Sequence, residues 1–184
     1  HNRLVRPALL TNLHLADGEY LVFTLNRKAL IANTPNLLAM VRQIAAASAN
    51  MPVVAPLRGA AAEAVKQCLE QLGGAAKMHV VEPLSYLEFG YLTAHAKGIV
   101  TDSGNVAEEA TFNGVPCITL NSYTEHVETV KQGTNVLVGE DPEALAAALN
   151  TLQAGQWKHA SIPDRWDGRS ADRIVSILLE QRRG

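Results

Sequence analysis

The feature that most constrains this chain is a regular alternation of short apolar segments with longer segments of helical periodicity. Strands in such a pattern form a parallel sheet, and right-handed crossovers place helices on both of its faces. The sequence therefore predicts an α/β fold: a doubly wound, three-layer, Rossmann-like parallel sheet. The strands are predicted at residues 20–25, 51–56, 78–81, 99–101, 115–120 and 135–138.

The length of 184 residues suits a single domain. Residues 1–19 form a leading segment of mixed polar and apolar residues without a clear period, as if the chain were cut from a longer one. A last helix is predicted over residues 168–182. Its apolar face is defined by Ala171, Ile174, Val175, Leu178 and Leu179.

Charge and composition exclude several classes of protein. The net charge of −2 provides no general attraction for nucleic acid or acidic membranes. The apolar runs are too short to span a bilayer, and no leader segment precedes the first strand. Cys68 and Cys117 lie within apolar patterns, which predicts buried free thiols in a reducing cytoplasm. The six histidines lack the spacing of metal ligands, so no metal site is expected.

The segment from Gly98 to Ala110 predicts an anion site. A β-branched run ends at Asp102-Ser103-Gly104, and helix-forming residues follow from Val106. Such a junction presents free backbone N–H groups and the positive end of a helix dipole, which together suit a phosphate. The glutamates further along the helix suggest contact with a sugar. The alternative interpretation is an ordinary strand–turn–helix junction capped by Ser103.

Further candidates follow the other strands, because ligands of such sheets bind at the carboxyl ends of strands. Arg27 and Arg58 would face one crevice and could neutralise a diphosphate. Leu84 and Phe89 could flank a planar base. The alternatives are solvated arginines for the first pair and core residues for the second.

Several motifs of this chain, taken together, resemble those of the non-hydrolysing UDP-N-acetylglucosamine 2-epimerases. That family has TDSGGxQEEA, GxP, TERPE and GTN at the same intervals as this chain, preceded by PLxYxxF and followed by DGxAxxRI. The resemblance runs from about Tyr20 to Ile177. Its motifs here are Pro83–Phe89, Val100–Ala110, Gly114–Pro116, Thr124–Glu128, Gly133–Asn135 and Asp167–Val175.

The resemblance implies the carboxyl-terminal, UDP-holding half of an enzyme with two Rossmann-like domains, as in GT-B glycosyltransferases. It implies that Ser103 and Gly104 hold the β-phosphate, that Glu109 holds the ribose hydroxyls, and that Arg27 lies near the phosphates. Leu84 and Phe89 would line the uracil pocket. The UDP-binding set that we predict is completed by Arg58, Asn105 and His126.

The implied reaction inverts C2 of UDP-GlcNAc by eliminating UDP and adding it back to give UDP-ManNAc, without a metal or organic cofactor. The expected partners are UDP or a UDP-N-acetylhexosamine, an amino-terminal Rossmann-like domain, and a second copy of the full-length protein in a homodimer. No catalytic residue is assigned in this chain, because the family's acid–base residues come from the other domain.

The chain also departs from the family pattern. The family's HRxEN motif is reduced to Asn26-Arg27, and Arg58 replaces a histidine. Asn105 replaces the second glycine of TDSGG, and His126 replaces the arginine of TERPE. An asparagine can neither take up a proton nor carry a charge, unlike the histidine that it replaces. These changes affect catalysis and regulation more than UDP recognition.

Three functional hypotheses follow. The chain is the UDP-binding half of a 2-epimerase that needs another domain for turnover, or a non-catalytic nucleotide-binding or regulatory module that has kept the UDP pocket. The third hypothesis is half of a GT-B glycosyltransferase. The motifs disfavour the third, because they are more particular than the fold.

Overall fold

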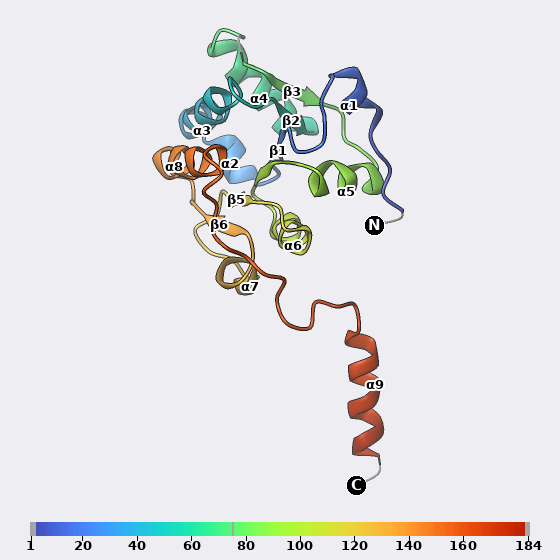
Figure 1. The fold of residues 1–184 in the computed structure, drawn as a ribbon. Coiled ribbons are helices and arrows are strands. Elements are labelled where there is room, and N and C mark those ends of the chain that lie inside the picture. The colour runs from blue at the N-terminus through green and yellow to red at the C-terminus, as the bar shows by residue number, and fades with distance from the viewer. Residues whose placement is uncertain (1–2, 75, 183–184) are drawn as a thin grey trace.

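The computed structural model describes residues 3–74 and 76–182, which form a six-stranded sheet flanked by helices (Figure 1). All neighbouring strands are parallel, and their order is β3-β2-β1-β4-β5-β6. This order confirms the doubly wound fold that the sequence predicts. The strands are β1 (Leu21–Phe23), β2 (Val53–Pro56), β3 (Met78–Val81), β4 (Gly98–Thr101), β5 (Cys117–Thr119) and β6 (Asn135–Leu137).

Several helices begin or end at residues that local sequence signals indicate. Asn33 caps α3, with Pro35 in its first turn, and Ser85 and Glu88 form a capping box at α5. Gly114 ends α6 in a left-handed conformation with φ +70. The helices are α1 (Ala8–Asn12), α2 (Lys28–Ala32), α3 (Thr34–Ala47), α4 (Gly59–Gln71), α5 (Tyr86–Ala94), α6 (Gly104–Asn113), α7 (Val127–Lys131), α8 (Pro142–Gln153) and α9 (Ser170–Gln181).

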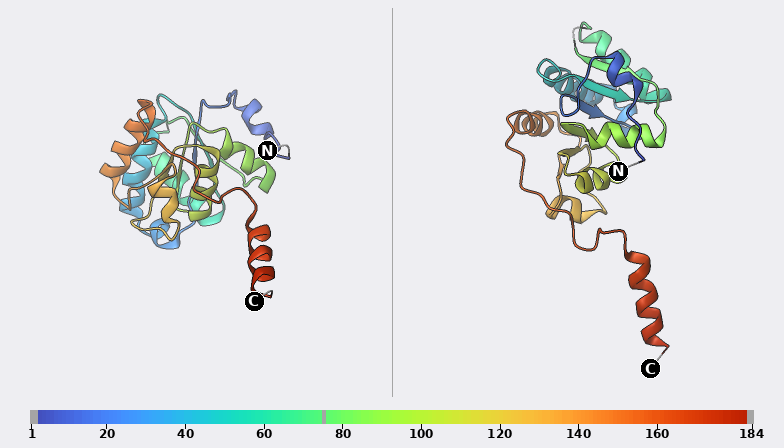
Figure 2. Two further views of the ribbon diagram at one scale, coloured as in Figure 1. Left: turned by 60° about the horizontal axis from the view of Figure 1, so that its bottom comes forward. Right: turned by 45° about the vertical axis from the view of Figure 1, so that its right-hand side comes forward.

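Two apolar cores lie on opposite faces of the sheet. Alternate residues of a strand point to opposite faces, so Leu21 and Phe23 enter one core while Val22 enters the other. Helices α2, α3, α4 and α8 cover the first face, and α1, α5 and α6 cover the second (Figures 1 and 2). The three layers therefore agree with the sequence-based expectation.

The last helix, α9, does not join either core. Figures 1 and 2 show it projecting away from the sheet at the end of a long connecting segment. None of its residues is buried, and each of its large apolar side chains is more than half exposed. The predicted amphipathic helix thus forms, but its apolar face packs on nothing in the described part of the chain. These side chains are Ile174, Val175, Ile177, Leu178 and Leu179.

A buried polar cluster explains the Gly133-Thr134-Asn135 motif. The Asn135 side chain accepts a hydrogen bond from Thr119 Oγ1 at 2.5 Å and donates one to Thr129 Oγ1 at 3.1 Å. The Thr134 N–H donates to Thr111 Oγ1 at 3.2 Å. These bonds tie α6, α7, β5 and β6 together, and they satisfy polar groups that would otherwise be costly to bury.

We expect Gly133→Ala to destabilise the fold. An added Cβ would lie 2.3 Å from Thr111 Oγ1 and 2.7 Å from the Thr129 carbonyl oxygen, so backbone would have to move. Overpacking of this kind costs about 1–3 kcal/mol in the free energy of unfolding, which urea denaturation would measure. Gly90→Ala is the control, because its Cβ would approach only a flexible methyl group of Leu4. Equal stability of the two variants would contradict the packing that we describe.

Candidate functional site

The candidate site lies at the carboxyl ends of β1 and β4, the point where the strand order reverses. β1 pairs with β2 on one side and with β4 on the other, so the loops after β1 and β4 diverge from a shared crevice. Asp102 closes the base of this crevice, since its carboxylate accepts from the Asn26 N–H at 3.0 and 2.9 Å and from the Arg27 N–H at 2.6 Å. The two loops are therefore held in a fixed relation to each other.

Helix α6 begins at this crevice. The Ser103 side chain caps it by accepting from the Val106 N–H at 3.5 Å, and the Ser103 N–H donates to Thr101 Oγ1 at 3.0 Å. The first N–H groups of a helix have no partner within the helix, so those of Gly104 and Asn105 lie at the positive end of α6. The predicted strand–turn–helix junction is present, and its geometry suits an anion.

The absence of a side chain at Gly104 makes room for His126. A Cβ at residue 104 would lie 2.7 Å from Cδ2 and 2.9 Å from Nε2 of the His126 ring. The ring thus lies against the start of α6. Its Nδ1 is 2.7 Å from Oε1 of Glu108 on the next turn of the helix. His126, which replaces the family's arginine, therefore lies at the predicted phosphate position and already has a carboxylate partner.

A pocket with a volume of ≈ 470 Å³ opens beside this helix terminus. It mixes backbone and side-chain donors with the carboxylates of Asp102 and Glu125. A second pocket, of ≈ 480 Å³, shares Asn26 with the first and contains three of the predicted UDP-binding residues, Arg58, Leu84 and Phe89. The first pocket is lined by Asn26, Arg27, Asp102, Ser103, Gly104, Asn121, Tyr123, Thr124, Glu125 and His126.

Leu84 and Phe89 lie in the second pocket and are both partly exposed, with Pro56 and Pro83 beside them. Apolar and aromatic side chains on one part of this lining, with polar groups of Thr24, Asn26 and Arg58 on the rest, could flank a planar base. Leu84 and Phe89 therefore line the same pocket. The alternative that the sequence left open for both was a role in the core. Arg58 lies at the same pocket, not at the helix terminus.

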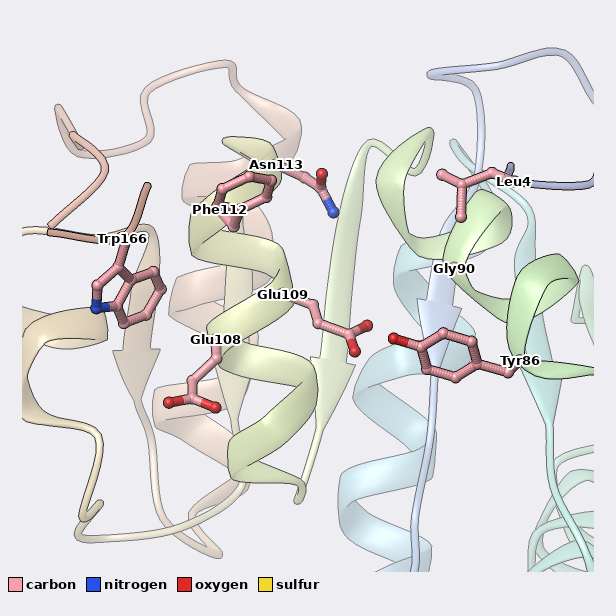
Figure 3. A pocket seen from close by; sticks show the side chains of 8 residues that line it. All are labelled: Leu4, Tyr86, Gly90, Glu108, Glu109, Phe112, Asn113 and Trp166. Carbon is pink, nitrogen blue, oxygen red and sulfur yellow. The ribbon is translucent and has the colours of Figure 1, made fainter. Parts of the chain in front are cut away.

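Glu109 and Glu108 point to different sides of α6. Figure 3 shows the Glu109 carboxylate directed across a third pocket toward Tyr86 of α5, whereas Glu108 lies on the Trp166 side of the helix. Burial raises the pKa of Glu109, and the negative charge of Glu108 adds to this increase. A half-buried carboxylate of this kind suits neutral hydroxyl donors, as the predicted ribose contact requires.

Arg27 lines the first pocket but is already bonded. Its Nη1 donates to Asn121 Oδ1 at 2.8 Å, and its Nη2 donates to the Leu120 carbonyl oxygen at 3.1 Å and contacts Oε1 of Glu140. The remaining predicted residue, Asn105, is exposed on the first turn of α6 and lies outside the linings of the three pockets.

Sequence reasoning missed Asp102, Asn121 and Glu140 as parts of the site. Asp102 belongs to the segment from Gly98 to Ala110, but nothing in the sequence indicates that its carboxylate accepts hydrogen bonds from the loop after β1. The roles of Asn121 and Glu140 depend on β5 and β6 lying beside β4, an order that the sequence does not state. Only their position directly after a strand could have suggested them.

Residues 3–74 and 76–182 contain neither a candidate metal site nor a candidate membrane span. No group of three or more His, Cys, Asp or Glu side chains is placed to hold a metal ion. No helix in the same residues is long and apolar enough to cross a membrane.

The fold and site together define a Rossmann-like unit, with a helix terminus at the switch point of the sheet and a pocket on either side of that helix. Residues 2–179 match the UDP-N-acetylglucosamine 2-epimerase family, and the chain belongs to that family. The family resemblance predicted from the motifs is thereby confirmed. Related structures include GT-B enzymes, which agrees with the predicted fold class.

Individual relatives agree with this assignment. The chain is 34% identical over 173 residues to the UDP-N-acetylglucosamine 2-epimerase of Methanocaldococcus jannaschii, and the match covers 91% of the chain and 46% of that protein. A crystal structure of that organism's enzyme in complex with UDP-GlcNAc and UDP has a TM-score of 0.74 at 32% identity, covering 94% of this chain and 48% of that one.

A third relative acts on a different sugar nucleotide. The UDP-2,3-diacetamido-2,3-dideoxy-D-glucuronate 2-epimerase of Pseudomonas aeruginosa is 34% identical over 136 residues, which cover 73% of the chain and 37% of that protein. The chain thus spans about half the length, or less, of the relatives described here.

Proposed function

We propose that this chain is the UDP-binding, carboxyl-terminal half of a UDP-sugar 2-epimerase. The diphosphate binds at the start of α6, against Ser103, Gly104 and His126. The uracil enters the pocket of Leu84 and Phe89, and Glu109 accepts hydrogen bonds from the ribose hydroxyls. The proposed UDP-binding residues also include Arg58, beside the base, and Asn105, beside the phosphates.

The observation that carries this proposal is the placement of α6. Its amino terminus opens at the topological switch point, and pockets lie on both sides of its first two turns. A nucleoside diphosphate has an anionic end and an uncharged, planar end, and this arrangement offers one environment for each. The family match and the related complex with UDP-GlcNAc and UDP support the same choice of ligand.

The sugar and the rest of the protein form the second part of the proposal. The substrate is a UDP-N-acetylhexosamine, and epimerisation at C2 uses acid–base residues of a second Rossmann-like domain, in a protein that forms homodimers. The matches cover only about half of the M. jannaschii protein, so the rest of that protein has no counterpart among the described residues. Both cysteines are free and buried, which suits the cytoplasm as its location.

A non-catalytic regulatory module is the second candidate function. Asn26 cannot act as an acid or base, and His126 and Arg27 each have a carboxylate partner. A module that senses UDP-sugars needs only the binding part of the site. Both candidates use the same pocket, and turnover of the longer protein would separate them.

We expect affinity to rise from uridine through UMP to UDP. Each phosphate adds charge that the helix terminus can stabilise, so UDP should bind roughly tenfold more tightly than uridine in an open half-site. Isothermal titration calorimetry with the three ligands would measure the difference, with adenosine diphosphate as the control for the base pocket. Equal affinity for uridine and UDP would rule out the phosphate site at α6.

A further inference from the structure

Arg27 spans the carboxyl edge of half of the sheet. It starts directly after β1, and its guanidinium reaches the Leu120 carbonyl oxygen and Asn121 Oδ1, which follow β5, and the carboxylate of Glu140, which follows β6. The side chains of Arg27 and Glu140 are 36% and 38% exposed, so this ion pair is partly shielded from solvent. Solvent therefore screens this pair in part, but its charges lie beside the pocket that Arg27 lines and can act on a ligand there.

The position of Glu140 is fixed by its own backbone. Its carbonyl oxygen accepts from Asn36 Nδ2 at 3.1 Å, which connects it to α3. The preceding residue, Gly139, has φ +63, and its N–H donates to the Asn121 carbonyl oxygen at 3.1 Å. The turn after β6 is therefore held from two sides, and it directs the Glu140 carboxylate at the guanidinium.

We propose that Glu140 sets the phosphate affinity of this site by neutralising Arg27. The inference rests on the proposed function, in which a diphosphate occupies the pocket shared by Arg27, Ser103 and Gly104. An incoming phosphate must share the guanidinium with a carboxylate that is already in place. Glu140 is thus a specificity-determining residue that limits how strongly the site binds anionic ligands, although it does not itself line the pocket.

The other contacts of Arg27 determine the direction of the effect. Leu120 and Asn121 offer two neutral acceptors that hold the guanidinium independently of Glu140. Removal of the Glu140 charge should therefore leave Arg27 in place with its positive charge exposed to the pocket. If Glu140 instead served only to position Arg27, its removal would release the side chain and weaken phosphate binding.

The side chain of His126, at the phosphate end, also has a carboxylate partner. His126 lies beside Gly104 and is paired with Glu108. Asp102 and Glu125 add negative charge to the pocket lining. Because Arg27 and His126 each contact a carboxylate, the helix terminus and its N–H groups are the main attraction for phosphate. Glu140 is the carboxylate whose removal changes this balance with the least disturbance to α6.

The test is Glu140→Gln, which keeps the shape of the side chain and removes its charge. We expect the affinity for UDP to rise roughly three- to tenfold at low ionic strength, with a smaller rise for UMP and none for uridine. The gain should shrink as salt is added. Glu143→Gln is the matched control, because this exposed residue of α8 gives the same change in net charge. Circular dichroism and thermal melting would check that both variants fold.

A double variant makes the assignment specific. In Arg27→Gln, the further change Glu140→Gln should no longer raise UDP affinity, because the charge that it unmasks is gone. Unchanged or weaker UDP binding by Glu140→Gln, in a wild-type chain that does bind UDP, would overturn the inference and leave the proposed function intact. Failure of the wild-type chain to bind either UDP or uridine would overturn the proposed function, and the inference with it.

Discussion

Incubation of this chain alone with UDP-GlcNAc in deuterated water is expected to yield neither UDP-ManNAc nor deuterium at C2. Inversion at C2 needs a base on one face of the sugar and an acid on the other, each with a pKa tuned by its surroundings. The acid–base candidates are Glu109, Glu125 and His126, which line the pockets, and Glu128 in the first turn of α7. Glu109 is assigned to the ribose, and His126 is paired with Glu108.

The open half-site adds a second reason for inactivity. The sugar would extend from the start of α6 into solvent, where no closed cavity could exclude water or strengthen electrostatic contacts. A typical enzyme accelerates its reaction by at least about a millionfold, so the expected loss is very large. Nuclear magnetic resonance would follow both the product and the C2 proton. The full-length epimerase of M. jannaschii is the positive control.

Measurable exchange at C2 by this chain would contradict the assignment. It would mean that a base and an acid both belong to the described site, and Glu125 and Glu128 would be the first residues to substitute. Exchange without net epimerisation would show that at least the base belongs to the site.

The second large effect is expected for Glu109→Ala, which should weaken UDP binding roughly tenfold to a hundredfold. A carboxylate that accepts hydrogen bonds from hydroxyl groups contributes about 1.5–3 kcal/mol, and the half-buried position of Glu109 limits competition by water. Uridine should lose affinity by a similar factor, since it retains the ribose. Calorimetry with UDP and NMR titration with uridine would measure the two changes.

Glu108→Ala is the control for this prediction. Both glutamates line the third pocket, but Figure 3 shows the Glu108 side chain on the Trp166 side of α6 and the Glu109 side chain on the Tyr86 side. Glu108 pairs with His126. Its loss should leave uridine binding unchanged and affect only ligands with phosphates. Equal losses of uridine affinity in the two variants would mean that the ribose lies elsewhere.

The raised pKa of Glu109 adds a pH dependence to the same site. Because burial disfavours the charged carboxylate, Glu109 takes up a proton at a higher pH than an exposed glutamate does. The protonated group is a poorer acceptor, so uridine affinity should fall as the pH is lowered toward that pKa. Uridine is the suitable probe because it lacks the phosphates that titrate near pH 6.

Local sequence patterns determined the elements of the fold well. The strand Met78–Val81 is present as predicted, and α6 ends at Asn113 before Gly114, where the sequence placed its end. One short helix, α2, was missed because its five residues are too few to show a period. The sequence also predicts a short helix over residues 124–131, but α7 begins only at Val127, since the Thr124 side chain accepts from the His126 N–H in a turn.

The junction between β4 and α6, where we propose that the phosphates bind, could also be predicted from the sequence. Strand, capping serine, glycine and helix are consecutive in the chain, so their geometry is fixed by local turn chemistry. Pairing the loops after β1 and β4 required only the general rule for doubly wound sheets. Every predicted site residue except Asn105 lines one of the three pockets.

By itself, then, the sequence determined the elements, the fold class, the family and the helix terminus at the centre of the site. Only the tertiary structure decided that Arg27 bonds to Glu140, that His126 pairs with Glu108, and that α9 leaves its apolar face exposed. The physical reason is the range of the interactions. Periodicity and turn chemistry act between residues close in sequence, whereas Arg27 and Glu140 meet only because β1, β4, β5 and β6 lie side by side in that order.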